Sequence, residues 1–326
     1  RSGSHRNHSI PYPKAIESFS HSITPLPIDS YVMGALLGDG CFRHGKHAIG
    51  FSTDDKELLN YVNEGLSKSF VPNSVNSKYD YRVHSTEIAN IFDKYGLIGK
   101  YSYEKHIPKD YLLSTTNDRR KLLQGLMDTD GSAHTDNGSC CEFTTTSKQL
   151  SEDVQFLVRS LGGRVYVKER YTHYTHKGVY KRGRLSYRMN ISFTDFCPFK
   201  LKRKASKYYN RVQQKEKYID SIRLMKKKEE CVCIKVSSSD NLYITDGFNL
   251  THNTSEALVL AQNYMNTMPK SKTFYIKAEG RLSEDMQKRS GMKFTESADN
   301  WDYGTVFIFK CNVFETVSTM IIDLLK

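Results

Sequence analysis

The sequence predicts a mixed α/β (α+β) protein in which two copies of one α/β unit follow each other along the chain. Residues 31–40 form an apolar helical pattern with an internal glycine that ends in Asp-Gly, and this pattern recurs at residues 122–131. Strand-like sequence and then an amphipathic helix follow each copy. With 326 residues, the chain is long enough for two or three domains. We expect a short β-rich segment and a partial α/β segment after this tandem.

The composition argues against a membrane protein and against a disulfide-rich protein. Charged residues make up 26% of the chain, and no apolar run approaches the roughly 18 residues that a spanning helix needs. Residues 1–30 are polar and rich in histidine, unlike a signal peptide. The seven cysteines include no Cys-x-x-Cys pair, so neither a zinc ribbon nor a disulfide scaffold is expected. We expect a reduced, intracellular protein with no membrane partner.

The net charge of +12 lies upstream of residue 254, because residues 254–326 hold nine basic and nine acidic residues. It is densest between residues 164 and 228, in runs such as 180–184 and 200–204, and tyrosines lie among these basic residues. Basic stretches with interleaved aromatic rings suit a phosphate backbone. A solvated basic face is the alternative, and charge alone does not separate the two.

Each copy of the repeated pattern is followed by a predicted strand. These strands are expected at 47–52 after the first copy and at 141–145 after the second. In residues 150–161, apolar side chains follow the helical period at positions 150, 154, 157, 158 and 161. We therefore expect the two copies to share one order of elements.

The glycine inside each repeated helix predicts a close contact between the two helices. Gly34 and Gly125 occupy the same position of the repeat, although glycine costs about 1 kcal/mol relative to alanine inside a helix. A missing Cβ lets two helices approach along that face. The glycines that end the two copies, Gly40 and Gly131, are expected to adopt the left-handed conformation that ends many helices.

The acidic residue before each terminal glycine predicts a metal site. Asp39 and Asp130 are 91 residues apart in sequence, but paired helices would bring both to one end. Two carboxylates repel each other unless a cation lies between them, and Mg²⁺ with oxygen ligands suits phosphodiester hydrolysis. An ordinary turn is the alternative for either Asp-Gly alone, and the repetition argues against it.

The two decapeptides resemble the LAGLIDADG motifs of homing endonucleases, with Asp39 and Asp130 where that family keeps its metal-binding catalytic carboxylates. The resemblance implies an αββαββα unit in each half and a monomeric, pseudosymmetric enzyme whose motif helices form the interface between the halves. It implies Mg²⁺, or Mn²⁺ in its place, with the backbone carbonyls of Gly38 and Thr129 as further ligands. It also implies a double-stranded DNA target whose major groove the strands contact.

A lysine near each active site is a further feature of this family. The pentapeptide at 104–108 matches the family pattern of a lysine ahead of an Ile-Pro pair, and this nominates Lys105. In the second half, the corresponding hexapeptide is 199–204, in which Lys204 is favoured over Lys202. Such a lysine could orient water or stabilise charge that develops on the phosphate. A contact to the phosphate backbone, or an exposed position, is the alternative for both lysines.

The segment 231–254 resembles the C-terminal end of an intein, with His252, Asn253 and Thr254 as the junction. The side-chain amide of Asn253 can attack its own backbone carbonyl and break the 253–254 bond. His252 can protonate the leaving amine, and Thr254 offers the hydroxyl that accepts an upstream host segment. Two expected strands, at 231–236 and 241–245, precede the junction. These residues predict autocatalytic chemistry at Asn253.

The sequence departs from both family patterns. The seventh motif position is Leu37 in the first copy and Asp128 in the second, so the halves are not equivalent. Cys233 stands where many inteins have an aspartate. The chain begins at Arg1, without the Cys or Ser and the Thr-x-x-His block with which a complete intein starts. We expect a fragment that needs the missing N-terminal intein half for splicing but keeps the capacity for cleavage at Asn253.

Residues 254–326 follow the order helix, strand, helix, strand of an α/β domain. The helix that begins at Thr254 and the apolar strand that begins at Thr273 resemble the region after the phosphate loop of RecA-type recombinase ATPases, as found in phages. The resemblance implies that Thr254 completes a Gly-Lys-Thr loop and that Glu279 polarises water. Any other α/β host protein is the alternative.

The sequence therefore predicts five segments. They are a lead-in at 1–28, motif halves at 29–118 and 119–216, a splicing segment at 217–253 and a host fragment at 254–326. The leading hypothesis is a site-specific, Mg²⁺-dependent double-strand DNA endonuclease, encoded within an intein of a prokaryote or phage and acting in the cytoplasm. The alternatives are a self-splicing fragment whose nuclease is inactive, and a protein that binds DNA without cutting it.

Overall fold

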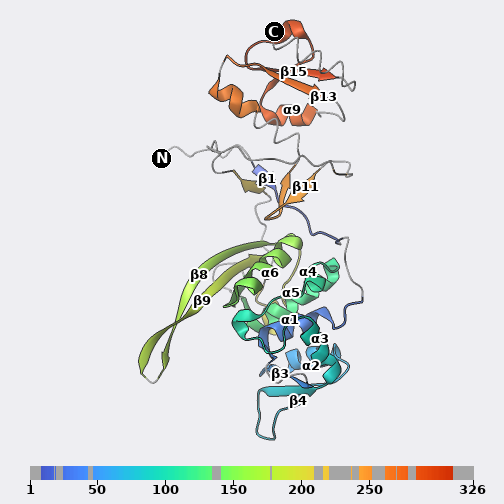
Figure 1. Cartoon of the computed structure of the whole chain (residues 1–326), viewed down its shortest axis with the longest axis vertical. Helices are drawn as coiled ribbons and strands as arrows, with labels where there is room; N and C mark the ends of the chain where they lie inside the picture. The colour runs from blue at the N-terminus through green and yellow to red at the C-terminus, as the bar shows by residue number, and fades with distance from the viewer. Residues whose placement is uncertain are drawn as a thin grey trace. The chain divides into compact units, whose positions relative to one another are not determined.

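The chain divides into two compact units, one of residues 11–217 and one that combines residues 1–10 with residues 218–326. This computed structural model, drawn in Figure 1, describes residues 9–17, 19, 25–42, 47–133, 141–176, 178–208, 216–219, 236, 242–251, 261–268, 270–277 and 284–310. Within these ranges, no helix is long and apolar enough to cross a membrane.

The first half of the unit 11–217 is a helix, two strands, a helix, two strands and a helix. These elements are α1 (Ser30–Asp39), β2 (Gly40–Cys41), β3 (Ala48–Ser52), α2 (Lys56–Glu64), β4 (Val71–Pro72), β5 (Asp80–His84) and α3 (Thr86–Lys94). The strands form an antiparallel sheet in the order β2-β3-β5-β4. The short helices η2 (Ser102–Glu104) and α4 (Lys109–Leu112) lead on to the second half.

The second half repeats this order of elements. It consists of α5 (Thr116–Asp130), β6 (Gly131–Ala133), β7 (Cys141–Thr145), α6 (Lys148–Ser160), β8 (Arg164–His176), β9 (Val179–Ser192) and α7 (Lys202–Ala205). Its sheet has the equivalent antiparallel order β6-β7-β9-β8. The strands expected at 47–52 and 141–145 and the helix expected at 150–161 are thereby confirmed, with bounds that differ by one or two residues.

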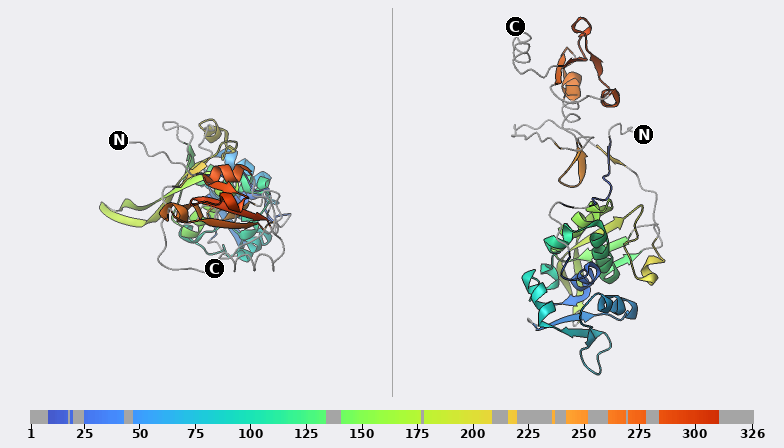
Figure 2. Two further views of the ribbon diagram at one scale, coloured as in Figure 1. Left: turned by 90° about the horizontal axis from the view of Figure 1, so that it is seen from above. Right: turned by 90° about the vertical axis from the view of Figure 1, so that its right-hand side faces the viewer.

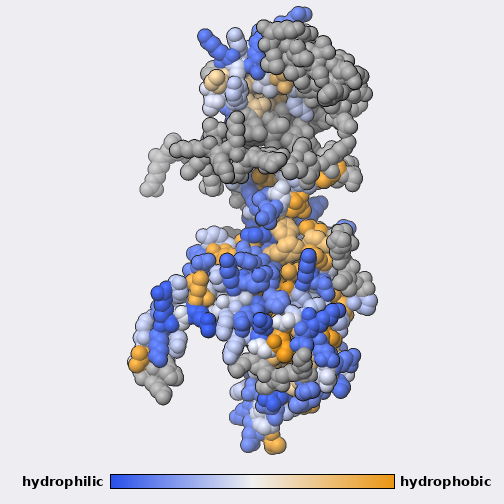
Figure 3. Space-filling model, in the orientation of Figure 1, coloured by the Kyte–Doolittle hydropathy of each residue, from blue (hydrophilic) through white to orange (hydrophobic). Residues whose placement is uncertain are grey.

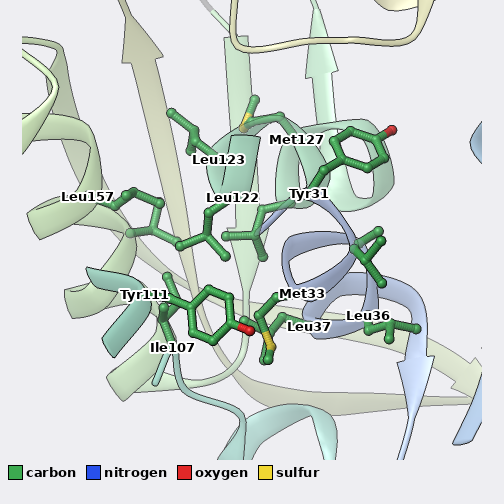
Figure 4. Packing of buried hydrophobic residues seen from close by; sticks show 14 of the residues in the cluster. Tyr31, Met33, Leu36, Leu37, Ile107, Tyr111, Leu122, Leu123, Met127 and Leu157 are labelled. Atoms are coloured by element: carbon green, nitrogen blue, oxygen red, sulfur yellow. The ribbon is translucent and has the colours of Figure 1, made fainter. Parts of the chain in front are cut away.

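The two motif helices, α1 and α5, pack directly against each other along their internal glycines. A Cβ on Gly34 would lie 2.1 Å from the carbonyl oxygen of Leu122, and a Cβ on Gly125 would lie 2.1 Å from that of Tyr31. The predicted close approach is confirmed. Large buried side chains surround this contact, and Figure 4 shows side chains of both helices, Met33 of α1 and Leu122 of α5 among them, in one continuous core.

The glycines that end α1 and α5 do not adopt the left-handed conformation predicted for them. Gly40 has φ −76° and ψ 146°, and Gly131 has φ −89° and ψ 153°. Each motif helix passes directly into the first strand of its sheet, so the glycine that follows the helix is already extended. Glycine is needed there for space: a Cβ would lie 2.2 Å from the oxygen of Leu36 or 2.5 Å from that of Met127.

The two halves differ most in their last pair of strands. The strands β4 and β5 pair over two residues, whereas β8 and β9 pair from Arg164↔Ser192 to His176↔Val179. Beyond residue 167 this ribbon projects from the body of its unit, as Figures 1 and 2 show. Residues 168–175 and 178–182 are exposed, and Figure 3 shows mostly hydrophilic side chains along it.

The remaining described elements are short. The strands β1 (Ser9–Pro11) and β10 (Glu216–Tyr218) form a two-stranded sheet, and β11 (Tyr243–Thr245) pairs with β12 (Asn249–Thr251) as an antiparallel hairpin. A parallel sheet β13-β15-β14 follows, made of β13 (Thr273–Lys277), β14 (Lys293–Thr295) and β15 (Thr305–Lys310), with α9 (Glu284–Ser290) between its first two strands. This parallel sheet agrees with the α/β pattern predicted for the C-terminal segment.

Candidate active site

Asp39 and Asp130 lie at adjoining ends of the two motif helices. Each is the last residue of its helix, α1 or α5. The ends are so close that a Cβ on Gly38 would lie 2.0 Å from the hydroxyl oxygen of Thr129 and 3.4 Å from a carboxylate oxygen of Asp130. Asp39 is half-buried and Asp130 is exposed. The repeated Asp-Gly sequences are therefore one site, shared by the two halves.

The environment of these carboxylates disfavours their charge. Desolvation by burial, and next the charge of Asp130, raise the pKa of Asp39 from 3.8 to about 6, although Lys105 and Lys204 act in the opposite direction. Desolvation by the surrounding protein also raises the pKa of Asp130, again against the two lysines. Both acids lie at the negative end of a helix dipole, which adds to the repulsion. A bound cation would relieve it.

Lys105 is buried beneath the end of α1. Its side chain is 6% exposed, and its ammonium donates hydrogen bonds to the carbonyl oxygens of Gly38 (2.7 Å) and Gly40 (2.9 Å). Burial lowers the pKa of Lys105, and the carboxylates of Asp130 and Asp39 oppose that change. The lysine therefore caps the first motif helix while lying within the field of both acids.

Lys204 holds the equivalent position beneath the end of α5. Its ammonium donates to the carbonyl oxygens of Asp128 (2.7 Å) and Gly131 (2.6 Å). It also lies 3.0 Å from the oxygen of Met127 and 3.1 Å from that of Thr129. Lys202, the rejected choice, is exposed. Burial lowers the pKa of Lys204, against the charge of Asp128.

The donors at the helix ends fit a hard divalent cation. Carboxylate oxygens suit Mg²⁺ and Mn²⁺, and Mg²⁺ often takes only one or two protein carboxylates and completes its shell with water and substrate phosphate. Among the described residues, no group of three or more His, Cys, Asp or Glu side chains could hold a metal ion. The carbonyls of Gly38 and Thr129, predicted as further ligands, already accept hydrogen bonds from lysine. The carboxylates of Asp39 and Asp130 are therefore the main candidates.

The second half of this site lies in a segment with known relatives. Residues 117–198 match the family model of the LAGLIDADG-like domain. This segment of the chain is therefore similar to a LAGLIDADG-like domain. Of the two predicted motifs, the match includes the second, at 122–131.

Two curated proteins that are similar to the chain are replicative DNA helicases DnaB. The helicase of Mycobacterium intracellulare is 26% identical over 261 residues, which cover 77% of this chain and 39% of that protein. The helicase of Nostoc sp. (strain PCC 7120 / SAG 25.82 / UTEX 2576) is 27% identical over 169 residues, which cover 46% of this chain and 19% of that protein. The chain thus spans less than half the length of the relatives it matches. They name a helicase where the sequence predicted a recombinase.

Two solved structures with LAGLIDADG domains are also similar. The N-terminal LAGLIDADG domain of DUF199/WhiA is 12% identical, with a TM-score of 0.28, over 52% of this chain and 78% of that one. Full-length DUF199/WhiA from Thermatoga maritima is 10% identical, with a TM-score of 0.29, over 52% of this chain and 53% of that one.

The ribbon of the LAGLIDADG-like domain carries basic side chains at its surface. Lys168 of β8 lies directly opposite Arg188 of β9. The guanidinium of Arg188 pairs with the carboxylate of Glu142 on β7, whereas Lys168 is exposed. Aromatic rings hold other basic groups in place: the guanidinium of Arg182 lies 3.4 Å from the ring centre of Tyr171. In the basic run at 180–184, residues 180–182 and Arg184 are exposed. An interface with phosphates requires such exposure.

Other residues of the site escaped the sequence-based prediction. Asp128 was noted only as a departure from the first motif, yet its carboxylate is 1% exposed and accepts a 2.7 Å hydrogen bond from the hydroxyl of Tyr31. Asp153, also buried, accepts the backbone N–H of Ile107. A buried acid within a helical pattern is the signal that could have identified them, since such a carboxylate needs a partner. The predicted His252, Asn253, Thr254 and Glu279 lie outside the described residues.

Proposed function

We propose that residues 29–216 form a site-specific endonuclease that makes a double-strand break in DNA. The observation that supports this most strongly is the adjoining position of Asp39 and Asp130 at the ends of paired helices, each above a buried lysine. A DNA-binding protein without nuclease activity has no evident use for two adjoining carboxylates whose pKa values are both raised by their surroundings. The match to the LAGLIDADG-like domain supports the same conclusion.

In this proposal the carboxylates of Asp39 and Asp130 hold Mg²⁺, for which Mn²⁺ can substitute. The cation, when bound, would lower the pKa of a water molecule and stabilise negative charge on the scissile phosphate. Lys105 and Lys204 keep the two helix ends closed through the carbonyls they bind. Their positive charges also favour the ionised form of both acids, which is the form that binds metal.

The sheets, and above all the ribbon β8–β9, would bind the DNA. Exposed basic residues contribute affinity through the phosphates, and this contribution depends on salt. Because β4 and β5 of the first half pair over only two residues, the two halves would cover unequal lengths of DNA. The target should therefore be asymmetric around the cleavage position.

Cleavage of genes without the insertion tests the proposal. DNA that carries uninterrupted replicative helicase genes, with recombinase genes in parallel, is incubated with the chain and Mg²⁺. The parent should cut at one position, and Asp39→Asn and Asp130→Asn should abolish the double-strand break or leave a nick. Glu87→Gln, an exposed acid in the first turn of α3, is the control and should cut as the parent does. Cutting by both Asn variants at the parental rate would refute the metal-binding role of these acids.

A second function is proposed for the segment that ends at Asn253. We infer autocatalytic cleavage there, with His252 as proton donor and Thr254 as the hydroxyl for splicing. The antiparallel hairpin β11–β12, which ends two residues before Asn253, supports this proposal because its first strand falls within the strand expected at 241–245. Residues 231–235 of the other expected strand lie outside the described residues. On incubation the chain should break at the bond between residues 253 and 254, and mass spectrometry of the two fragments would show this. Asn253→Ala should stop the cleavage. If the nuclease is inactive, this chemistry is the alternative function.

The host of the insertion is proposed to be a replicative helicase. Both curated relatives are DnaB helicases, whereas the sequence suggested a RecA-type recombinase. The parallel sheet β13-β15-β14 suits an α/β host domain of either kind. Preferential cleavage of helicase genes over recombinase genes would decide between them.

A further inference from the structure

The position of Lys204 depends on the chain segment that precedes it. Its ammonium sits beneath the end of α5, but its backbone belongs to α7, which Leu201 caps. The carboxylate of Asp128 accepts the backbone N–H of Leu201 at 3.0 Å and that of Lys200 at 3.1 Å. Asp128 therefore fixes the start of the short helix from which Lys204 reaches back to the motif helix.

The first half of the protein holds Asp128 in turn. The hydroxyl of Tyr31, the first residue of the first motif, donates to the same carboxylate at 2.7 Å. The ammonium of Lys200 lies 4.6 Å from the ring centre of Tyr31 and 3.8 Å from that of Tyr61, both in the first half. The segment that carries Lys204 is thus tied across the interface between the halves.

A second buried carboxylate does the same for Lys105. Asp153 of α6 is 6% exposed and accepts the backbone N–H of Ile107 at 2.8 Å, while Gln149 donates to its other oxygen. The hydroxyl of Ser147, which caps α6, donates to the carbonyl oxygen of Lys105 at 2.6 Å. Here the second half holds the lysine-bearing segment of the first half.

We propose that Asp128 and Asp153 are positioning residues, each of which fixes the segment that carries one of the two buried lysines. A lysine ammonium sits on a flexible four-carbon stem, so its place is set by its backbone and by what surrounds it. Groups that orient a functional side chain are needed for its effect as much as the side chain itself. Because the constraints cross the interface, each lysine is placed with the help of the opposite half.

Lysine reactivity tests this placement without any DNA. The folded chain is treated briefly with an amine-acetylating ester, and the extent of labelling at Lys105 and Lys204 is measured by peptide mass spectrometry. Both should be protected in the parent relative to the exposed Lys202. Asp128→Leu, which introduces the residue found at this position in the first motif, should raise labelling of Lys204 by about tenfold or more, given the usual strength of hydrogen bonds to a charged group. Labelling of Lys105 should not change.

The matched variant is Asp153→Leu, which should have the opposite selectivity and raise labelling of Lys105 alone. Asp128→Asn and Asp153→Asn keep one acceptor oxygen and should restore most of the protection. If Asp128→Leu does not fold, Asp128→Asn and Tyr31→Phe carry the test with smaller increases at Lys204. Equal labelling in the parent and in every folded variant, or a joint rise at both lysines, would overturn the proposal.

The effect on cleavage rests on the proposed nuclease function. Each Leu variant should slow the cutting of one DNA strand more than the other, and the two variants should affect opposite strands, as denaturing gels with one labelled strand at a time would show. If the parent does not cut DNA, the nuclease proposal fails, while the labelling pattern still decides the positioning proposal. Equal slowing of both strands by both variants, together with selective labelling, would refute the assignment of each lysine to the cut in one strand.

Discussion

Gly34 and Gly125 face each other where α1 packs on α5, and each helix occupies the space that a side chain on the other would need. The Cβ of an alanine at either position would lie 2.1 Å from a backbone carbonyl oxygen of the opposite helix. The spacing of the halves is thus set by contact between backbones. The adjoining position of Asp39 and Asp130 follows from this contact.

Gly125→Ala should strongly destabilise the unit 11–217. The added methyl group would meet backbone atoms, which cannot rotate away, so we expect a loss of about 3 kcal/mol or more in the free energy of unfolding. Urea denaturation followed by circular dichroism measures this loss. Asn117→Ala, at an exposed position of the same helix, is the control and should change the stability by less than about 0.5 kcal/mol. A parental midpoint for Gly125→Ala would contradict the close packing.

The stability of the metal-free protein should fall as the pH rises from about 4 to about 6. Because the pKa of Asp39 is raised from 3.8 to about 6, the folded state keeps a proton that the unfolded chain has already released in this window. Asp39→Asn should therefore stabilise the metal-free protein above pH 6, by up to about 2 kcal/mol, and have no such effect near pH 4. Thermal denaturation at several pH values in a chelator measures the difference. A gain that does not depend on pH would rule out this explanation.

Replacement of the buried lysines should cost stability unequally. Lys204 lies within hydrogen-bond distance of four carbonyl oxygens, and Lys105 binds two. We expect Lys204→Met to lower the free energy of unfolding by about 2 to 3 kcal/mol, and Lys105→Met to lower it by less. Chemical denaturation of both variants at pH 7 compares them. A larger loss for Lys105→Met than for Lys204→Met would show that the cost of burying the lysine charge outweighs the stabilisation from capping the helix ends.

Basic residues of the ribbon should contribute to DNA affinity through salt-dependent contacts. Lys168→Ala and Arg170→Ala should each reduce the slope of log K against log salt concentration by about 1, because one phosphate contact is lost. Fluorescence anisotropy with a DNA duplex at several salt concentrations measures the slope. The control is Lys94→Ala, which changes an exposed lysine of α3 rather than of the ribbon. This variant should leave the slope unchanged. Unchanged slopes for all three variants would exclude the ribbon from the interface.

Much of the motif-helix contact could be predicted from sequence because its determinants are local and repeated. Two glycines at equivalent positions imply close helices, and two acids at equivalent ends imply one shared site. The conformation of Gly40 and Gly131 was predicted wrongly because a glycine after a helix most often signals a left-handed cap. Here the helix continues directly into a strand, and the requirement for glycine comes from the nearby carbonyls of Leu36 and Met127.

The contacts that hold the lysines could not be predicted in the same way. Tyr31 and Asp128 are 97 residues apart, and no local pattern links a tyrosine at the start of one motif to an acid near the end of the next. The prediction of Lys204 over Lys202 agrees with the place of Lys204 beneath α5, but no sequence pattern explains why Lys204 is buried. The length of the ribbon β8–β9 likewise depends on pairing, which periodicity does not reveal.

The hydrogen bond between Tyr31 and Asp128 also means that the two halves are not interchangeable. A second half that paired with a copy of itself would place Leu122, which holds the motif position of Tyr31, against Asp128. A buried carboxylate would then lack its hydroxyl partner, at a cost of about 1 to 3 kcal/mol at each of the two copies. A first half paired with itself would strand two tyrosine hydroxyls opposite Leu37. The two halves, expressed as separate chains, should therefore pair with each other in preference to copies of themselves.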